Sequence, residues 1–274
     1  MAKTAHSTLL LRSRQLSLAL ADIREGFAAI HVWPTMAVQE IRQRYRRTTL
    51  GPLWLTISTA ALILGMGPLY GRLFGQQIGD YFPYLTVSYV TWLLIANMIG
   101  DACVAFTGSE SIIKQIKLPL MVHVLRTVSK NLLLFAHNLI VVLGVLAFYP
   151  PQWGWHLLLA PLGLLLLALN GIWLSFLLGM ACARFRDVPP IVTSVVQVTF
   201  FLTPVMWQKG MLGSYQWAAD INPLFHLLEL VRRPMLGGVP DPLSWAVVAG
   251  MSILGGGITL LIFARYRARI AYWV

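Results

Sequence analysis

Long apolar segments alternate with short polar ones along most of this chain. Six of these segments have the length of membrane-spanning helices, because roughly 20 apolar residues at about 1.5 Å per residue cross the hydrocarbon core of a bilayer. We place them at 53–73, 82–106, 126–149, 156–181, 188–206 and 244–263. Lipid leaves no external partner for backbone N–H and C=O groups, so the predicted fold class is an all-α integral membrane protein.

The segment before the first span has a different pattern. Over residues 9–33, apolar side chains recur at helical spacing with polar ones between them, which predicts an amphipathic helix lying along the cytoplasmic interface. Trp33-Pro34 should end this helix, and a second short basic helix over 35–49 should lead into the bilayer. We therefore divide the chain into a cytoplasmic amphipathic and basic segment, 1–50, and a six-helix transmembrane domain, 51–274.

The stretch between the last two spans, 207–243, is too apolar for an ordinary external loop. We expect two short re-entrant helices dipping into the outer leaflet, the second beginning at Asn222-Pro223 and ending at Gly237-Gly238. Irregular backbone at that depth is tolerated where protein covers it or where it lines a cavity.

The composition agrees with a membrane protein, and the distribution of charge predicts its orientation in the membrane. The chain is 57% hydrophobic and 11% charged, whereas soluble domains carry about 25% charged residues. Of the 21 Lys and Arg residues, 17 fall in 1–50, 107–130, 182–190 and 264–274. The other four are Arg72, Lys209, Arg232 and Arg233. This positive-inside bias predicts that both termini lie in the cytoplasm. Because the basic residues flank membrane spans and form no stripe on a soluble module, nucleic-acid binding is not expected.

The chain contains no recognisable catalytic or cofactor motif. It has no G-x-x-x-x-G-K-[ST] phosphate loop, no G-x-S-x-G elbow and no histidine pair at metal-ligand spacing. Cys103 and Cys182 fall near cytoplasmic ends of spans, where a disulfide is not expected. We therefore expect no enzyme activity, no metal and no cofactor on this chain.

Asp101 is the one acidic residue well inside a predicted span. A carboxylate in that position is costly and often functional. Two interpretations remain open, namely pairing with a nearby Lys or Arg and a direct role in transport. An ion-coupled carrier usually needs several such groups.

Four motifs occur in order along the chain. Glu40–Trp54 contains R-x-R-Y-R-R-x-x-L-G-P-L-W, Phe185–Val188 reads F-R-D-V, Phe200–Pro204 reads F-F-L-T-P, and Asn222-Pro-Leu precedes Leu236-Gly-Gly238. This ordered set resembles the permeases of polysaccharide-export ABC transporters, which move lipid-linked O-antigen, capsule or teichoic acid across the bacterial inner membrane. The L-G-P-L-W form resembles the O-antigen exporters more than the capsule exporters.

The resemblance implies a homodimeric permease in the inner (cytoplasmic) membrane, with two copies of a separate cytoplasmic ATPase that carry ATP and Mg. It also implies that the loop between the second and third spans couples to the ATPase. Its candidate contact residues are Glu110, Ser111, Lys114, Gln115 and Lys117. A solvated loop without a partner is the alternative, and Arg184, Arg186 and Asp187 of the next internal loop can add contacts.

The implied substrate is a glycan on a polyprenyl pyrophosphate. Guanidinium groups suit phosphate, so Arg42, Arg46 and Arg47 are candidates for the headgroup, with anchoring to anionic lipid as the alternative. Aromatic rings suit sugar faces, although an aromatic belt at the headgroups explains them equally. The channel candidates are Tyr70, Phe74, Tyr81, Phe82, Tyr84, Tyr89 and Trp92.

Charged residues of the re-entrant segment form a candidate external gate made of Glu229, Arg232 and Arg233. Glu229 and Arg233 are four residues apart, so one helical face can pair them. Two rival classes remain: an ion-coupled secondary carrier, and a membrane-embedded glycosyl- or acyltransferase, for which Glu229, Asp220 and His226 are the nearest cluster.

Overall fold

The computed structural model describes residues 2–46, 50–51 and 53–274, with side chains from residue 14 onward, and it contains no strand over those ranges. Five of the described helices are long and apolar enough to cross a membrane. They are α3 (Leu53–Leu73), α4 (Ile78–Cys103), α6 (Leu120–Phe148), α7 (Leu159–Arg184) and α11 (Pro242–Trp273). The all-helical membrane class is therefore confirmed.

The fifth predicted span corresponds to a shorter helix, α8 (Val188–Leu202). Its 15 residues are apolar, and at about 1.5 Å per residue they extend over roughly 22 Å. The chain then turns at 203–207 instead of continuing as a helix to 206. None of the α8 side chains is buried within the chain.

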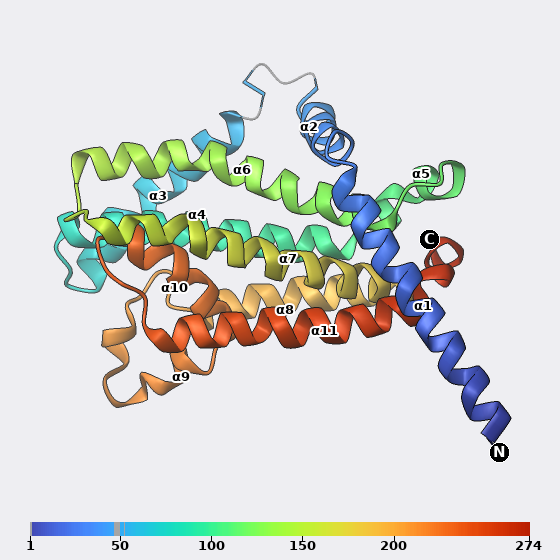
Figure 1. Ribbon diagram of the computed structural model, residues 1–274. Helices are drawn as coiled ribbons and strands as arrows, with labels where there is room; N and C mark the ends of the chain where they lie inside the picture. The colour runs from blue at the N-terminus through green and yellow to red at the C-terminus, as the bar shows by residue number, and fades with distance from the viewer. Residues whose placement is uncertain (1, 47–49, 52) are drawn as a thin grey trace.

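The long helices run roughly side by side, with α4 among them (Figure 1). Helix α4 contacts α3, α6, α7, α8 and α10, and it is the most buried of the five long helices. Close approach at α7 depends on glycine: a Cβ on Gly171 would lie 2.0 Å from the Met98 sulfur, and one on Gly179 would lie 2.9 Å from the Phe106 ring. The α4–α7 contact therefore forms the centre of the bundle.

The two ends of the bundle differ. The short helix α5 (Glu110–Gln115), which follows the 3-10 turn η1 (Thr107–Ser109), lies at the same end as the C-terminus (Figure 1). The elements α9 (Trp217–Asp220) and α10 (Pro223–Met235) lie toward the other end, which we call the outer end. Pro119 is the N-cap of α6 and ends the loop that follows α5.

Two helix bounds differ from the sequence prediction in a way that matters. Helix α6 begins at Leu120 and not near 126, so Arg126 and Lys130 lie well inside a buried helix and not in its first turns. Helix α11 continues past 263 to Trp273 and includes Arg265, Arg267 and Arg269. The end of α11 was missed because its last turns carry three arginines. The start of α6 was missed although residues 120–125 are apolar apart from His123.

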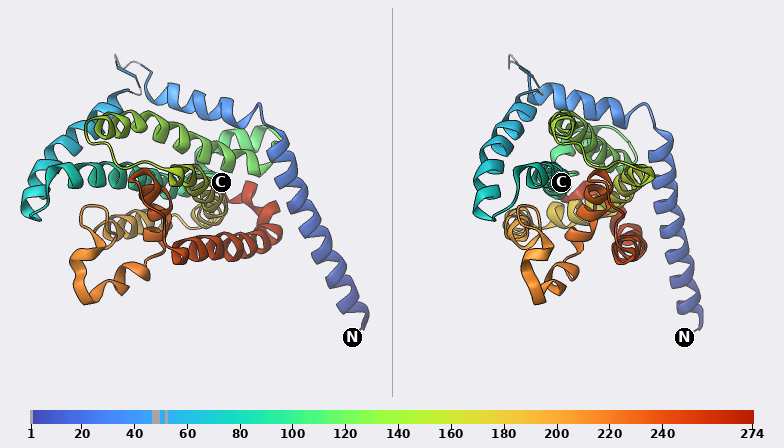
Figure 2. Two further views of the ribbon diagram at one scale, coloured as in Figure 1. Left: turned by 60° about the vertical axis from the view of Figure 1, so that its left-hand side comes forward. Right: turned by 90° about the vertical axis from the view of Figure 1, so that its left-hand side faces the viewer.

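The amphipathic N-terminal segment forms α1 (Ala2–Ala28) and α2 (Trp33–Arg44). Figure 2 shows α1 along one side of the bundle, with its N-terminal end projecting beyond the other helices. Asp22 anchors it, since Oδ1 accepts a hydrogen bond from the Met121 backbone at 3.1 Å and Oδ2 pairs with Arg267 at 3.0 Å. The predicted break is found, but at 29–32, and Pro34 stands in the first turn of α2.

Only part of the apolar face of α1 packs on the bundle, where Ile23 lies against the core. Ala19, Asp22 and Gly26 are buried against the neighbouring helices, while Leu20 and Phe27 are each 49% exposed. A helix with an anchored inner face and an exposed apolar face fits a position at a lipid interface.

The outer segment contains three short elements instead of two: η3 (Lys209–Tyr215), α9 and α10. The bounds predicted for the last of them are confirmed. Asn222 caps α10 by accepting the Leu224 N–H at 3.0 Å. Beyond its end, Gly237 has φ of +86°, where a side chain is strained, and a Cβ there would lie 2.6 Å from the Gln152 carbonyl oxygen.

Candidate functional site

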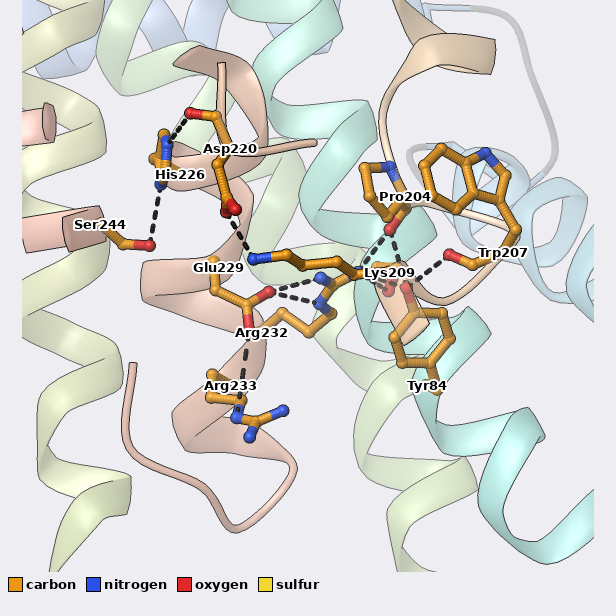
Figure 3. Close-up of polar contacts among 11 residues, drawn as sticks. Tyr84, Pro204, Trp207, Lys209, Asp220, His226, Glu229, Arg232, Arg233 and Ser244 are labelled. Carbon is orange, nitrogen blue, oxygen red and sulfur yellow. Dashed lines mark hydrogen bonds and ion pairs between the residues drawn. The ribbon is translucent and has the colours of Figure 1, made fainter. Parts of the chain in front are cut away.

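A buried arginine, Arg232 of α10, joins three elements near the outer end (Figure 3). Its side chain lies within the protein, at 4% exposure for the residue, and its Nη1 donates to Tyr84 Oη at 2.8 Å, to Ser88 Oγ at 3.1 Å and to the Pro204 carbonyl. Nη2 pairs with Glu229 one turn earlier on the same helix. The guanidinium also lies over the Tyr84 ring, 4.6 Å from its centroid.

Such a guanidinium is stable in the interior only when it is paired and hydrogen-bonded. Its partners come from α4, from α10 and from the turn that follows α8. Two tyrosines of α4 hold the same turn: Tyr84 Oη donates to the Trp207 carbonyl at 2.8 Å, and Tyr81 Oη donates to that of Met206 at 2.7 Å. The position of this turn is therefore fixed by α4 and α10 together.

A second polar cluster ties α9 to α10 and α11. Lys209 Nζ pairs with Asp220 Oδ1 at 2.5 Å. The two ring nitrogens of His226 contact Ser244 Oγ at 2.9 Å and the Asp220 carbonyl oxygen at 2.7 Å (Figure 3). Glu229, Asp220 and His226, considered from sequence as a transferase cluster, thus each make contacts that hold the outer segment together.

The structure brings the predicted gate residues together. The expected ion pair between Glu229 and Arg233 is present, with Nε 4.0 Å from Oε1, but the closer partner of Glu229 is Arg232. The reason is the orientation of α10, which turns Glu229 and Arg232 inward and leaves the Arg233 side chain 59% exposed. Gly238 leaves room for Arg233, since a Cβ there would lie 2.8 Å from its Nε.

A polar pocket of about 590 Å³ adjoins this cluster. We call it the outer pocket. Cations, carboxylates, amides and glycine backbone all line it. Its side-chain lining includes Tyr84, Gln208, Lys209, Gln216, Glu229, Arg232, Arg233 and Asp241.

Four of the predicted channel aromatics form a continuous row from α3 to the Arg232 cluster. Tyr70, Phe74, Tyr81 and Tyr84 follow one another with ring centroids 5.8, 6.1 and 6.4 Å apart. Tyr81 is fully buried, while the other three are half-buried. The row therefore contains three rings that reach the surface of the single chain.

The other three aromatics pack toward neighbouring elements. Phe82 meets Tyr149, with centroids 6.0 Å apart, and both Tyr89 and Trp92 meet Phe200 of α8, at 6.4 and 5.6 Å. Phe82 and Trp92 are buried and Tyr89 is half-buried. The two contacts on Phe200 belong to the interface between α4 and α8.

The predicted coupling residues lie on an exposed element. Glu110, Ser111, Lys114 and Gln115 are exposed on α5, and Lys117 is exposed just after it. Lys114 Nζ donates to Glu110 Oε1 at 2.7 Å, and this hydrogen bond lowers the pKa of the Glu110 carboxyl. A cavity of about 300 Å³ between Glu110, Arg186 and Trp273 connects α5 with the next internal loop and the end of α11.

The predicted headgroup arginines lie at and just after the end of α2. Arg42 and Arg46 are exposed, and Arg47 lies outside the described residues. No contact between these described side chains and the Arg232 cluster is found, so the two candidate sites are separate places in the fold.

Below α2, Lys130 of α6 forms a bridge that the sequence did not reveal. Lys130 Nζ contacts Glu40 Oε1 of α2 at 2.7 Å and Asp101 Oδ2 of α4 at 2.9 Å. Asn131 Nδ2 donates to the same Asp101 oxygen at 2.9 Å, and Arg126 Nε lies 3.4 Å from Glu40 Oε2. Asp101 therefore has the pairing that one of the two interpretations predicted. A lysine inside an apolar helix is the signal that would have identified the bridge.

Comparison with known proteins agrees with this architecture. Residues 32–236 match the ABC-2 type transporter family. The O-antigen export system permease protein RfbA of Myxococcus xanthus is 26% identical over 210 residues, covering 75% of this chain and 80% of the relative. A protein of the same name from Klebsiella pneumoniae is 21% identical over 241 residues, covering 85% and 91%.

A third relative carries a different name. The polysialic acid transport protein KpsM of Escherichia coli is 23% identical over 257 residues, covering 90% of this chain and 96% of the relative. The family match includes α2, the exposed α5, the Arg232 cluster and α10, and it extends over well more than half of the sequence. This chain is a member of the ABC-2 type transporter family.

Proposed function

We propose that this protein is the transmembrane permease subunit of an ATP-driven exporter that moves a lipid-linked polysaccharide, an O-antigen, across the bacterial inner membrane. The observation that carries the proposal is the similarity to permeases named for O-antigen export over 75–85% of the chain. A capsular polysaccharide is the second candidate, favoured by the similarity to a polysialic acid transport protein over 90% of the chain.

The proposed topology has six spans with both termini in the cytoplasm. The five long helices and α8 supply the spans, and the basic residues of α2 and of the end of α11 face the cytoplasm. Helices α9 and α10 re-enter the outer leaflet, where α10 packs on α7 so closely that a Cβ on Gly163 would lie 2.3 Å from the Leu230 carbonyl oxygen. This packing supplies the protein cover that re-entrant backbone needs.

The working assembly is a homodimer with two copies of a cytoplasmic ATPase, which binds ATP and Mg. Helix α8, with no buried side chain, and the largely exposed α3 offer apolar surface for a second copy and for the wall of a passage. The exposed α5 offers a small charged surface to the ATPase. Movement of α5 is transmitted through η1 to α4, which packs against five other helices.

The glycan enters from the cytoplasmic side with its pyrophosphate near α2. Arg42, Arg46 and Arg47 supply guanidinium groups for that headgroup, and the exposure of the first two supports this assignment. The half-buried aromatics Tyr70, Phe74, Tyr84 and Tyr89 are the preferred candidates for contact with sugars along the passage.

A cell-based experiment tests the proposal. The chain is expressed with the ATPase encoded beside it, in cells that make a polyprenyl-linked glycan but lack their own permease, and surface glycan is measured by antibody labelling. We expect surface glycan that depends on both proteins and on an intact nucleotide site in the ATPase. Surface glycan that is independent of the ATPase would refute the assignment.

A further inference from the structure

The outer pocket is a large cavity in the described part of the chain. Its volume of about 590 Å³ compares with about 300 to 330 Å³ for two apolar grooves and for the cavity beside α5. Small-molecule sites usually occupy about 300 to 1,000 Å³. The pocket reaches from α4 and α10 to the 208–216 segment and the loop at 236–241. It therefore has the size of a ligand site and is formed by four parts of the chain.

The floor of the pocket is rigid. Arg232 and Glu229 are buried and paired with each other, and Arg232 also donates a hydrogen bond to Tyr84 (Figure 3). Lys209 is held by Asp220 at 2.5 Å. A ligand in this pocket would meet side chains that already have fixed positions, which lowers the entropic cost of binding.

The rim, in contrast, offers polar groups that have capacity for a ligand. Among the described residues, the partner found for Arg233 is Glu229 at 4.0 Å, and its side chain is 59% exposed. Gln216 and Asp241 are exposed on two other segments of the lining. A guanidinium only donates hydrogen bonds, a carboxylate only accepts them, and an amide does both. The rim can therefore both donate to and accept from one ligand.

The charges of the pocket nearly cancel. Lys209 is neutralised by Asp220, and Arg232 by Glu229, whose second oxygen also faces Arg233. Asp241 adds a further negative charge to the lining. An anionic ligand would meet one incompletely paired cation beside two carboxylates. The lining thus favours a neutral ligand with several hydroxyl groups, because each hydroxyl can both donate and accept.

We propose that the outer pocket binds a neutral sugar residue of the glycan, with Arg233 as the main donor at its rim. This inference rests on the proposed function and goes beyond it by naming a sugar subsite within each copy of the chain. Helix α10, which lines the pocket, lies toward the end of the bundle opposite to α5 (Figure 1), so the sugar reaches the pocket after crossing the membrane. Occupation of the subsite would hold the emerging glycan and oppose backward sliding.

A binding experiment tests the subsite on the complete permease–ATPase complex in lipid nanodiscs. The probes are the methyl glycosides of glucose, galactose, mannose and N-acetylglucosamine, with glucuronate and inorganic phosphate as anionic comparisons. Saturation-transfer NMR measures binding to the wild type, to Arg233→Gln and to Gln216→Ala. Arg72→Gln is the matched control, because Arg72 is an exposed arginine of α3 that does not line the pocket.

We expect at least one neutral glycoside to bind in the millimolar range, and both pocket variants to bind it more weakly. Loss of a hydrogen bond from a charged donor predicts roughly a tenfold weaker affinity for Arg233→Gln. Arg72→Gln should bind like the wild type. The inference is overturned if no neutral glycoside binds, if the anions bind better, or if Arg233→Gln and Arg72→Gln behave alike.

The export assay with the partner ATPase separates this inference from the function on which it rests. Glycan export by the wild type without any glycoside binding would refute the subsite alone. Absence of export with every variant and with the wild type would refute the proposed function itself.

Discussion

The bridge from Lys130 to two carboxylates makes a sharp prediction about stability. Replacing Lys130 by Met keeps an apolar stem in α6 and removes the ammonium that contacts Glu40 at 2.7 Å and Asp101 at 2.9 Å. Asp101 keeps the hydrogen bond from Asn131, and Glu40 keeps Arg126 at 3.4 Å. The variant therefore leaves two carboxylates that the fold has partly withdrawn from water.

The expected cost follows from how far each group is buried. Removing one partner of a buried ion pair costs about 3–5 kcal/mol. Here the side-chain exposures are 4% for Lys130, 18% for Asp101 and 33% for Glu40. Solvent therefore screens much of the stabilisation that the Lys130–Glu40 ion pair contributes. We expect Lys130→Met to destabilise the protein by about 2–4 kcal/mol.

The assay is thermal unfolding of the purified protein in detergent, together with hydrogen exchange of α2. A loss of this size predicts a fall in Tm on the order of 5–10 °C, with faster exchange in Trp33–Arg44. The matched control is the double variant with Lys130→Met and Asp101→Asn, which removes the more buried stranded carboxylate and leaves Glu40 paired with Arg126. We expect it to recover most of the lost stability.

Two results would refute this reasoning. If Lys130→Met unfolds within about 1 °C of the wild type, the bridge does not contribute stability of the size expected from its burial. If the double variant is no more stable than the single one, the loss arises from packing of the lysine stem and not from uncompensated charge.

Three further predictions concern the headgroup site, the coupling helix and the outer segment. Arg42→Gln with Arg46→Gln should abolish glycan export while membrane insertion and ATPase co-purification persist; unchanged export would leave these arginines as lipid anchors. Lys114→Glu reverses a charge on exposed α5 and should weaken co-purification with the ATPase without lowering Tm; unaltered co-purification would remove α5 from the contact. Gly163→Val should lower stability by about 1–3 kcal/mol, measured by thermal unfolding, because its Cβ would lie 2.3 Å from the Leu230 carbonyl oxygen, and a wild-type Tm would contradict that packing.

The elements of this fold could largely be predicted because their signals are local. The first span was placed at 53–73, and α3 has those bounds. Asn222-Pro223 and Gly237 marked the ends of the last outer helix through cap chemistry that involves neighbouring residues. The end of α11 was missed because charged turns extend an apolar helix there, whereas the start of α6 was placed about six residues too late in a segment that is itself apolar.

The polar contacts could not be predicted because they join distant residues or depend on helix rotation. Lys130 meets Glu40 across 90 positions of the sequence. Helical spacing allows Glu229 to pair with either Arg232 or Arg233, and only the packing of α10 on α4 decides which arginine is buried. Likewise, α4 is apolar on most of its surface, so its pattern did not indicate which aromatics face the interior.

The central claim is that these helices form a passage driven by a separate ATPase. The most direct measurement reconstitutes the purified chain in liposomes, with and without that ATPase, and follows movement of a polyprenyl-pyrophosphate-linked glycan. The account predicts glycan movement that requires the ATPase and ATP hydrolysis. Uphill movement of a solute by the purified chain alone, driven by an ion gradient, would contradict it.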